Sequence, residues 1–374
     1  MTKRNFGAVR QLPSGRWQAK YRHPRSNQFI VAPSTFSTKR DADRWLANTQ
    51  VDIDRGNWID PAWGSVSLDE YAHSWLSQRL LAPRTVELYR GLLKHHIVPV
   101  LGKIDLNDLS PRDVRAWHSK LSKATEPGPV TVAKAYRLLR TVCETAVSDE
   151  MIGRNPCKLK GASVEHSPER PVATVAQVGE IFEAIEDRYG AMVLLAAWCS
   201  LRLGEALALT RGDIDLERGT VRVDKSAAEL QHGERIIGPP KTRAGVRTVA
   251  IPPHVVPLIE EHLTAFTGPN DADLVFVGTL GQPVRRASFY TAWLRATATR
   301  GPSGLRYHDL RHTGATLAAA TGASTKELMA RLGHASADAA LRYQHATADR
   351  DQAIARALSG LVAPIDNGES VRDS

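Results

Sequence analysis

The chain has 374 residues, a length that suggests two or three domains. Hydrophobic residues make up 42% and charged residues 24%, which is ordinary for a globular protein and excludes global disorder. The formal net charge is +9, and no apolar run reaches the roughly 20 residues that a membrane span needs. The basic N-terminus leads into no apolar segment of a secretion signal, so we expect no membrane contact.

The positive charge is concentrated in the first 40 residues, which contain nine basic residues and no acidic one. Such a segment is typical either of a solubilising tail or of a polyanion-binding surface. Aromatic residues are interleaved with the basic ones, and a solvated tail has no need of them, so the pattern favours nucleic-acid binding. The candidate DNA contacts in this segment are Arg10, Arg16, Lys20, Arg22 and Arg25.

The same segment predicts three short strands, at 6–11, 16–22 and 29–31, separated by turn residues. Ser37 or Thr38 is a candidate N-cap for a helix that ends near Gly56. The prediction is a small three-stranded sheet packed on one helix. A sheet of this kind can lay a basic face in a DNA groove.

Residues 57–65 are predicted to form a linker, and residues 66–157 read as helices, one of which begins at Ser110-Pro111. Residues 161–171 are predicted to form a second linker. The following block is the largest, with helical patterns at 174–187 and 189–199, strands at 220–223, 234–238 and 246–251, and further helices to about 360. The last residues are polar, and we expect a frayed tail.

The three cysteines, Cys143, Cys157 and Cys199, are odd in number and far apart in the sequence. A disulfide framework uses an even number of cysteines, and a cysteine-only metal site uses closely spaced ones. We therefore expect free thiols in a reducing, cytoplasmic setting.

Three local motifs in the last block carry candidate chemistry. They are 200–205, 308–313, and 331–334 followed by Tyr343. On a helix, His308, Arg311 and His312 share one face and form a surface that can bind phosphate and move protons. A surface cluster or a core histidine is the plain alternative. A zinc site at His308 and His312 is disfavoured, because the guanidinium between them repels a cation.

Taken together, the motifs resemble the tyrosine recombinase, or phage integrase, family. The family's C-terminal signature is Arg, Lys, His-x-x-Arg, His or Trp, and Tyr. The sequence supplies the whole set in this order, as Arg202, Lys241, His308, Arg311, His334 and Tyr343. Lys241 lies between two predicted strands and matches the family's hairpin lysine. The sequence is similar overall to those of integrases of actinobacterial phages.

The resemblance implies a metal-free phosphoryl transfer without cofactor or ATP. Tyr343 would attack the scissile phosphate, form a 3′-phosphotyrosine and release a 5′-hydroxyl, and the covalent bond would conserve the energy of the broken ester. Arg202 and Arg311 would hold the non-bridging oxygens.

The remaining members of the set would serve proton transfer and support. Lys241 would protonate the 5′-oxygen, His308 would assist proton transfer at Tyr343, and His334 would hydrogen-bond the phosphate. Glu205, one helical turn after Arg202, would brace the cluster from behind.

The resemblance also implies a multidomain α+β chain. Residues 1–60 would form an arm-type DNA-binding domain, 66–160 a helical (SAM-like) core-binding domain, 168–361 a mostly α catalytic domain with a small β-sheet, and 362–374 a flexible tail. Family members act as tetramers on double-stranded DNA with core and arm attachment sites. A host DNA-bending factor and a recombination directionality factor are the implied partners.

Three other functions remain open at this stage. A DNA-binding regulator without chemistry fits the basic arm, but the complete signature counts against it. A type IB topoisomerase-like enzyme shares the chemistry and would relax DNA without recombining it. A metal-dependent hydrolase using His308 and His312 would lose activity in a chelator.

Overall fold

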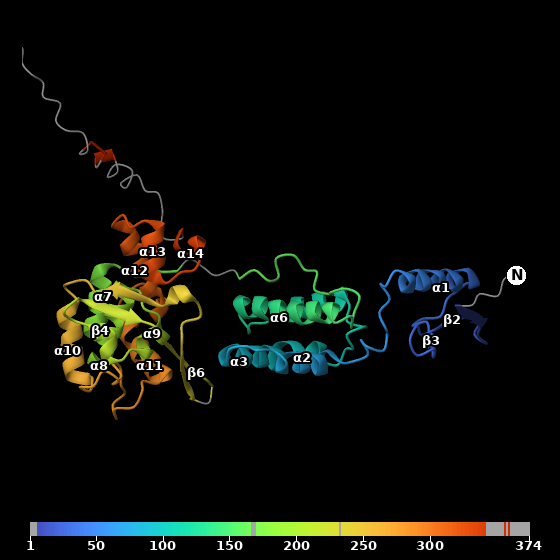
Figure 1. Ribbon diagram of the computed structural model, residues 1–374, viewed down its shortest axis with the longest axis horizontal. Helices are drawn as coiled ribbons and strands as arrows, with labels where there is room; N and C mark the ends of the chain where they lie inside the picture. Colours follow the sequence, from blue (N-terminus) through green and yellow to red (C-terminus); the bar gives the residue numbers. More distant parts are fainter. Residues whose placement is uncertain (1–5, 166–169, 232, 342–354, 357, 360–374) are drawn as a thin grey trace, which may run out of the picture. The chain divides into compact units, whose positions relative to one another are not determined.

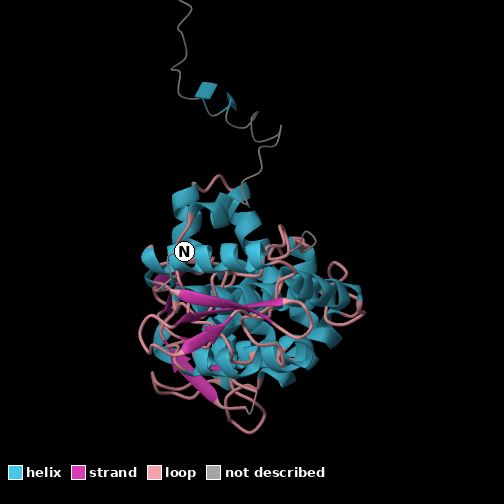
Figure 2. Ribbon diagram, turned by 90° about the vertical axis from the view of Figure 1, so that its right-hand side faces the viewer, coloured by secondary structure: helices cyan, strands magenta, loops and turns pink. Residues whose placement is uncertain are grey.

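The computed structural model describes residues 6–165, 170–231, 233–341, 355–356 and 358–359 (Figure 1). Tyr343 and the expected tail at 362–374 lie outside these residues. So does nearly all of the expected helical stretch between Tyr343 and the tail. The chain divides into two units, Met1–Ser167 and Pro168–Ser374. Helices make up most of the regular structure (Figure 2). None of the helices described is long and apolar enough to cross a membrane.

The first unit begins with the expected sheet and helix. The strands β1 (Gly7–Gln11), β2 (Trp17–Arg22) and β3 (Phe29–Val31) form an antiparallel sheet in that order, and α1 (Lys39–Asp54) packs on it. The alternation along β2 turns Ala19 and Tyr21 inward, where they are buried with residues of α1. Thr38 is the N-cap, and its side chain accepts a hydrogen bond from the Asp41 amide, at 3.1 Å.

The segment 57–65, predicted as a linker, contains no helix or strand. Its residues nevertheless form hydrogen bonds both with the sheet before it and with the helical part after it. On the sheet side, the Trp58 indole donates to the Tyr21 hydroxyl (2.9 Å), and Asp60 pairs with His23 (2.7 Å). On the helical side, the Asn107 amide donates to the Pro61 carbonyl (2.7 Å). The backbone of this segment is therefore fixed rather than a free tether.

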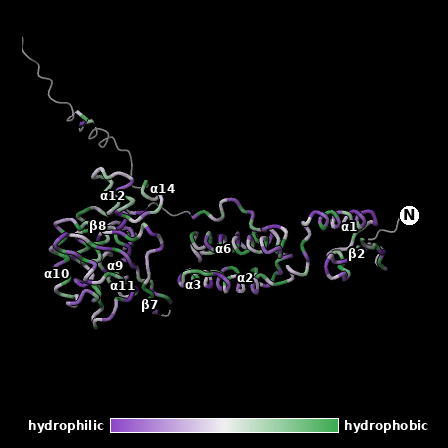
Figure 3. Tube along the Cα trace, in the orientation of Figure 1, coloured by the Kyte–Doolittle hydropathy of each residue, from purple (hydrophilic) through white to green (hydrophobic). Residues whose placement is uncertain are grey.

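The rest of the first unit is helical. Its elements are α2 (Leu68–Ser77), α3 (Pro83–Leu92), the π-helical turn η1 (Leu93–Ile97), α4 (Val98–Leu101), α5 (Pro111–Lys123) and α6 (Pro129–Ser148). The expected Ser110 cap with Pro111 at the first helical position is confirmed, within a reciprocal capping box. Apolar and hydrophilic stretches alternate along α6 (Figure 3). Its apolar side is buried in a core that includes Trp75, Trp117 and Tyr136.

The second unit is built around α8 (Asp187–Cys199), whose residues are almost all buried. The helices α7 (Val175–Ala184), α10 (Val256–Phe266) and α12 (Tyr307–Ala320) pack directly on it. The remaining helices are α9 (Leu203–Ala208), α11 (Arg286–Thr297), α13 (Thr325–Leu332) and α14 (Ala337–Leu341), with the short turns η2 (Arg211–Asp213) and η3 (Arg243–Gly245). From Tyr189 to Cys199, α8 is apolar on all sides, and the neighbouring helices pack around it.

The strands of the second unit form two small sheets. One has the order β4 (Ile214–Asp215), β5 (Thr220–Val223), β8 (Arg247–Ala250), and the other pairs β6 (Ser226–Glu229) with β7 (Arg235–Gly238). The strands predicted at 220–223, 234–238 and 246–251 are confirmed. The partner of β7 was not predicted, because Ser-Ala-Ala-Glu shows no alternation of apolar and polar residues.

Gly314 of α12 lies directly against the end of α8. A Cβ atom at this position would lie 2.1 Å from the Ala197 carbonyl oxygen and 2.8 Å from the Ser200 hydroxyl oxygen. Gly314→Ala should therefore push α12 away from α8 and destabilise the unit by about 1–3 kcal/mol. The measurement is the thermal unfolding midpoint. Gly179→Ala is the matched control, because nothing lies within 4 Å of that Cβ and the helix gains propensity. An unchanged or raised midpoint for Gly314→Ala would contradict the tight packing.

Candidate active site

Arg202 occupies the N-cap position of α9, and its side chain is 38% exposed. Its backbone amide donates to Glu205 Oε2 at 2.9 Å, and its Nη1 donates to Glu205 Oε1 at 2.6 Å. Glu205 itself is only 2% exposed. The carboxylate therefore holds Arg202 from the protein side, while part of the guanidinium remains within reach of a ligand.

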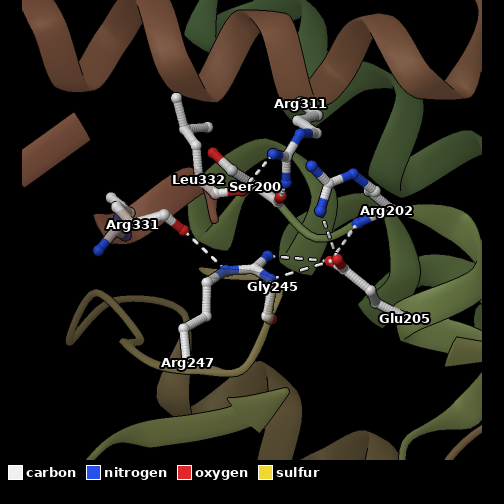
Figure 4. Close-up of polar contacts among 8 residues, drawn as sticks. All are labelled: Ser200, Arg202, Glu205, Gly245, Arg247, Arg311, Arg331 and Leu332. Atoms are coloured by element: carbon white, nitrogen blue, oxygen red, sulfur yellow. Dashed lines mark hydrogen bonds and ion pairs between the residues drawn. The ribbon is translucent and has the colours of Figure 1, made fainter. Parts of the chain in front are cut away.

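A second guanidinium binds the same carboxylate. Arg247, on β8, donates from Nη2 to Glu205 Oε2 (2.9 Å) and from Nη1 to Glu205 Oε1 (3.2 Å) (Figure 4). Burial alone would raise the pKa of Glu205, but the hydrogen bonds and charges of Arg247 and Arg202 outweigh it and lower the pKa. The carboxylate is therefore ionised between two arginines.

Arg311, on α12, is 2% exposed, and its guanidinium donates to the carbonyl oxygens of Ser200 and Leu332 (Figure 4). These carbonyls belong to the carboxyl ends of α8 and α13, where helix carbonyls carry partial negative charge. Ser200 has a left-handed backbone, with φ of +56°. Arg311 thus joins the ends of two helices beside the loop that leads into Arg202.

The histidines of the predicted set lie in the field of these arginines. His308 and His312 are one turn apart on α12 with ring centroids 5.2 Å apart, as the i, i+4 spacing predicts. His308 is exposed, yet the loss of water around its ring, and then the charges of His312 and Arg311, lower its pKa to about 4. His334 follows Gly333, which ends α13, and desolvation followed by Arg311 and Arg202 lowers its pKa to about 4. Both imidazoles are neutral at pH 7 in a site suited to an anion.

Of the two remaining members of the predicted set, the structure describes one. Lys241 is exposed, in the loop that connects β7 to β8. The far end of that loop is held at Gly245, whose carbonyl accepts a hydrogen bond from Arg247 Nη1 at 3.0 Å. Tyr343 lies outside the described residues.

Sequence reasoning missed two arginines that join these segments. Arg247 donates from Nε to the Arg331 carbonyl (2.9 Å), and Arg331 donates to the Trp198 carbonyl (2.6 Å). A signal for Arg247 was present, because it occupies an inward position of the alternating strand 246–251, where a charged residue needs a buried partner. Arg331 lies within a motif already singled out, but its contact is with a residue 133 positions away.

A metal centre was an alternative interpretation of the two α12 histidines. Among the described residues, no group of three or more His, Cys, Asp or Glu side chains is placed to hold a metal ion. The three cysteines are buried and free.

A second candidate surface is the face of the β1–β3 sheet that points away from α1. The strand register places Arg10 opposite Gln18 and Arg22 opposite Phe29. The Phe29 ring is 50% exposed, with Lys20 Nζ 4.3 Å and Arg22 Cζ 4.6 Å from its centroid. An exposed aromatic ring flanked by cations is typical of a nucleic-acid interface.

The other two basic residues predicted for this interface lie at its margins. Arg16 precedes β2, and its Nε donates to the Thr35 hydroxyl at 2.6 Å. Arg25 lies in the turn after β2, 5.8 Å from the centroid of the Trp63 ring. The structure therefore gathers Arg10, Lys20 and Arg22 on one face and directs the other two toward neighbouring segments.

Known proteins match the chain along most of its length. Residues 5–55 match the phage integrase N-terminal domain, residues 67–122 the N-terminal SAM-like domain of phage integrases, and residues 172–350 the phage integrase family. The putative prophage phiRv2 integrase of Mycobacterium tuberculosis (strain H37Rv) is 42% identical over 368 residues, which cover 96% of each chain. The integrase of Mycobacterium phage D29 is 37% identical, over 96% of this chain and 98% of its own.

Solved structures share the fold at lower identity. The Tn1549 transposon integrase, in complex with a circular intermediate DNA, has a TM-score of 0.67 at 20% identity over 79% of this chain and all of its own. A lambda integrase dimer bound to a COC′ core site has a TM-score of 0.58 at 17% identity, over 92% and 97% of the two chains. With its close relatives and its three matching domains, the chain belongs to the phage integrase family of tyrosine recombinases, which are site-specific DNA recombinases.

Proposed function

We propose that this recombinase cleaves and rejoins duplex DNA through a 3′-phosphotyrosyl intermediate on Tyr343, and so integrates and excises phage or prophage DNA at attachment sites. The observation that carries the proposal is the cluster around Glu205. Arg202, Arg311 and His334 come from three separate segments, and the charges of the two arginines lower the pKa of His334. Tyr343 follows His334 by nine residues in the sequence.

The two arginines of the signature would bind the non-bridging oxygens of the scissile phosphate. Their planar, always-charged forks suit the charge of a pentacoordinate transition state. Arg202 is braced by Glu205, and Arg311 by two helix ends, so neither side chain must reorganise when the phosphate arrives. The two arginines would then supply the electrostatic stabilisation without a metal. No ATP is needed, because the phosphotyrosine conserves the energy of the ester.

The proton steps would fall to the imidazoles and the lysine. A neutral His308 can accept the Tyr343 proton, and a neutral His334 can donate one hydrogen bond to the phosphate. Lys241 would protonate the 5′-oxygen, since its exposed loop position leaves it able to meet the leaving group. Each role requires the DNA strand to enter from the exposed side of Arg202.

The partners would be double-stranded DNA and further copies of this chain. The domains would be the arm domain at 1–60, the core-binding domain at 66–160 and the catalytic domain at 168–361. Lambda integrase has been solved as a tetramer bound to a Holliday junction, which supports a homotetramer here. A host DNA-bending factor and a directionality factor would assist in the cytoplasm of a bacterial host.

Tyr343→Phe should abolish cleavage and leave DNA binding near normal, because only the nucleophilic oxygen is removed. The measurement mixes each protein, in a chelator, with supercoiled plasmid carrying the DNA that flanks the gene. A denaturing gel should show protein covalently attached to DNA for the wild type alone. Cleavage without an adduct that is lost in the chelator would favour the metal hydrolase. Relaxation without recombination would favour a topoisomerase, and salt-sensitive binding without any adduct would favour a regulator.

Binding to the duplex around the mapped cleavage site should strengthen as pH falls from about 7.5 to about 5.5. His308 and His334 have pKa values of about 4 in the free protein, and a bound phosphate would raise both. Protons are then taken up on binding, so a lower pH favours the complex. If binding raises each pKa by about two units, binding at the lower pH should be about fourfold tighter per histidine.

This pH dependence is measured by fluorescence anisotropy in the Tyr343→Phe background, which prevents cleavage. The paired change His308→Gln with His334→Gln should remove it, whereas His254→Gln, at an exposed histidine of the same unit, should not. Full pH dependence in the paired variant would show that the phosphate does not contact these imidazoles.

Lys20→Ala with Arg22→Ala should weaken binding to arm-site DNA and reduce the slope of log affinity against log salt by about 2, because two phosphate contacts are lost. The control pair, Arg40→Ala with Arg44→Ala, removes the same charge from exposed positions on α1. Binding is titrated at several salt concentrations. Equal effects of the two pairs would mean that net charge, and not the sheet face, governs binding.

A further inference from the structure

We propose that Arg247 is a positioning residue for strand cleavage, which fixes three segments of the active site at once without touching DNA. The inference rests on the proposed roles of Arg202, Lys241 and His334. Arg247 is not a member of the family signature found in the sequence. Its side chain is 5% exposed, and each of the three guanidinium nitrogens already donates to a protein atom.

The first segment is the start of α9. Arg247 and Arg202 share the two oxygens of Glu205, with Arg247 on both Oε1 and Oε2 and the Arg202 side chain on Oε1 (Figure 4). A carboxylate held by Arg247 can bind Arg202 in one geometry. Without Arg247, the buried charge of Glu205 would have Arg202 as its remaining strong partner and would draw that guanidinium inward, away from the phosphate.

The second segment is the loop that carries Lys241. Arg247 Nη1 donates to the Gly245 carbonyl at 3.0 Å. Gly245 in turn lies against Pro240, since a Cβ atom at Gly245 would come within 2.5 Å of the Pro240 Cβ. Pro240 immediately precedes Lys241, so the hydrogen bond to Gly245 restrains the base of the loop on which the lysine sits.

The third segment is the end of α13. Arg247 Nε donates to the Arg331 carbonyl at 2.9 Å, three residues before His334. Gly333, at φ of +62°, packs so closely on the same loop that a Cβ atom there would lie 2.9 Å from the Ala244 carbonyl oxygen and 3.2 Å from Arg247 Nη1. The backbone that leads into His334 therefore rests on the residue that also holds Glu205.

Only an arginine can make this set of contacts. Its planar fork presents five donors in fixed directions, and here three of its nitrogens serve two backbone carbonyls and one carboxylate. A lysine could keep the charge beside Glu205, but it has a single nitrogen and could not reach all three segments. Charge and geometry can therefore be separated by experiment.

The test compares wild type, Arg247→Met and Arg247→Lys in single-turnover cleavage of the duplex around the mapped site. Arg247→Met should slow cleavage by about 100-fold, the scale of a small misplacement of reacting groups. Its dissociation constant for the same duplex should change by less than about twofold, because contacts with other phosphates dominate affinity. Arg247→Lys should recover part of the rate. The matched control is Arg218→Met, which removes the same side chain from an 83% exposed position in the same unit.

A double-mutant cycle with Glu205→Gln then tests the route of the effect. If Arg247 acts largely through Glu205, Arg247→Met should cost much less in the Glu205→Gln background than in the wild type. A structural role alone would lower binding and cleavage together, in proportion to the folded fraction given by thermal unfolding, and that result would overturn the proposal.

The failure of this inference can be told from failure of the proposed function. If wild type forms the Tyr343-dependent adduct and Arg247→Met cleaves as fast as Arg218→Met, only the positioning role of Arg247 is wrong. If wild type forms no adduct, the chemistry itself is wrong.

Discussion

The site depends on one buried carboxylate. Glu205 has almost no access to water, and its negative charge is stable because two guanidinium groups surround it. The same ion pairs bring β8 to the start of α9, although 42 residues separate Glu205 from Arg247. A single electrostatic requirement thus joins the β-sheet to the helical part of the unit at the place where the phosphate would bind.

Two other arginines of the site, Arg311 and Arg331, bind backbone carbonyls and not a carboxylate. Arg311 binds the ends of α8 and α13, and Arg331 binds Trp198 in the last turn of α8. Helix carboxyl ends offer unsatisfied carbonyls and a favourable dipole, so they can hold cations without adding acidic residues. The site therefore keeps a positive field, and this field is part of the reason that His308 and His334 stay neutral.

Sequence patterns were sufficient where one short segment determines the outcome. The alternation along 16–22, the Thr38 and Ser110 caps, and the one-turn spacing of His308 and His312 all depend on neighbours within a few residues. Strand β6 was missed because its small residues carry no period. The contacts of Arg247 were missed for a different reason. Their partners lie 42 and 84 residues away in the sequence, and a local sequence pattern does not extend that far.

Ser200 shows what this arrangement demands of the backbone. A left-handed conformation costs an L-residue about 1 kcal/mol, and glycine adopts it freely. A glycine at this position would relieve that cost, but it would also allow the two peptide units before Arg202 to adopt many other orientations. The serine restricts the turn to fewer conformations, and the Arg311 hydrogen bond to its carbonyl favours the strained one. Here the chain accepts a less stable backbone for a narrower distribution of orientations at the residue that would meet the phosphate.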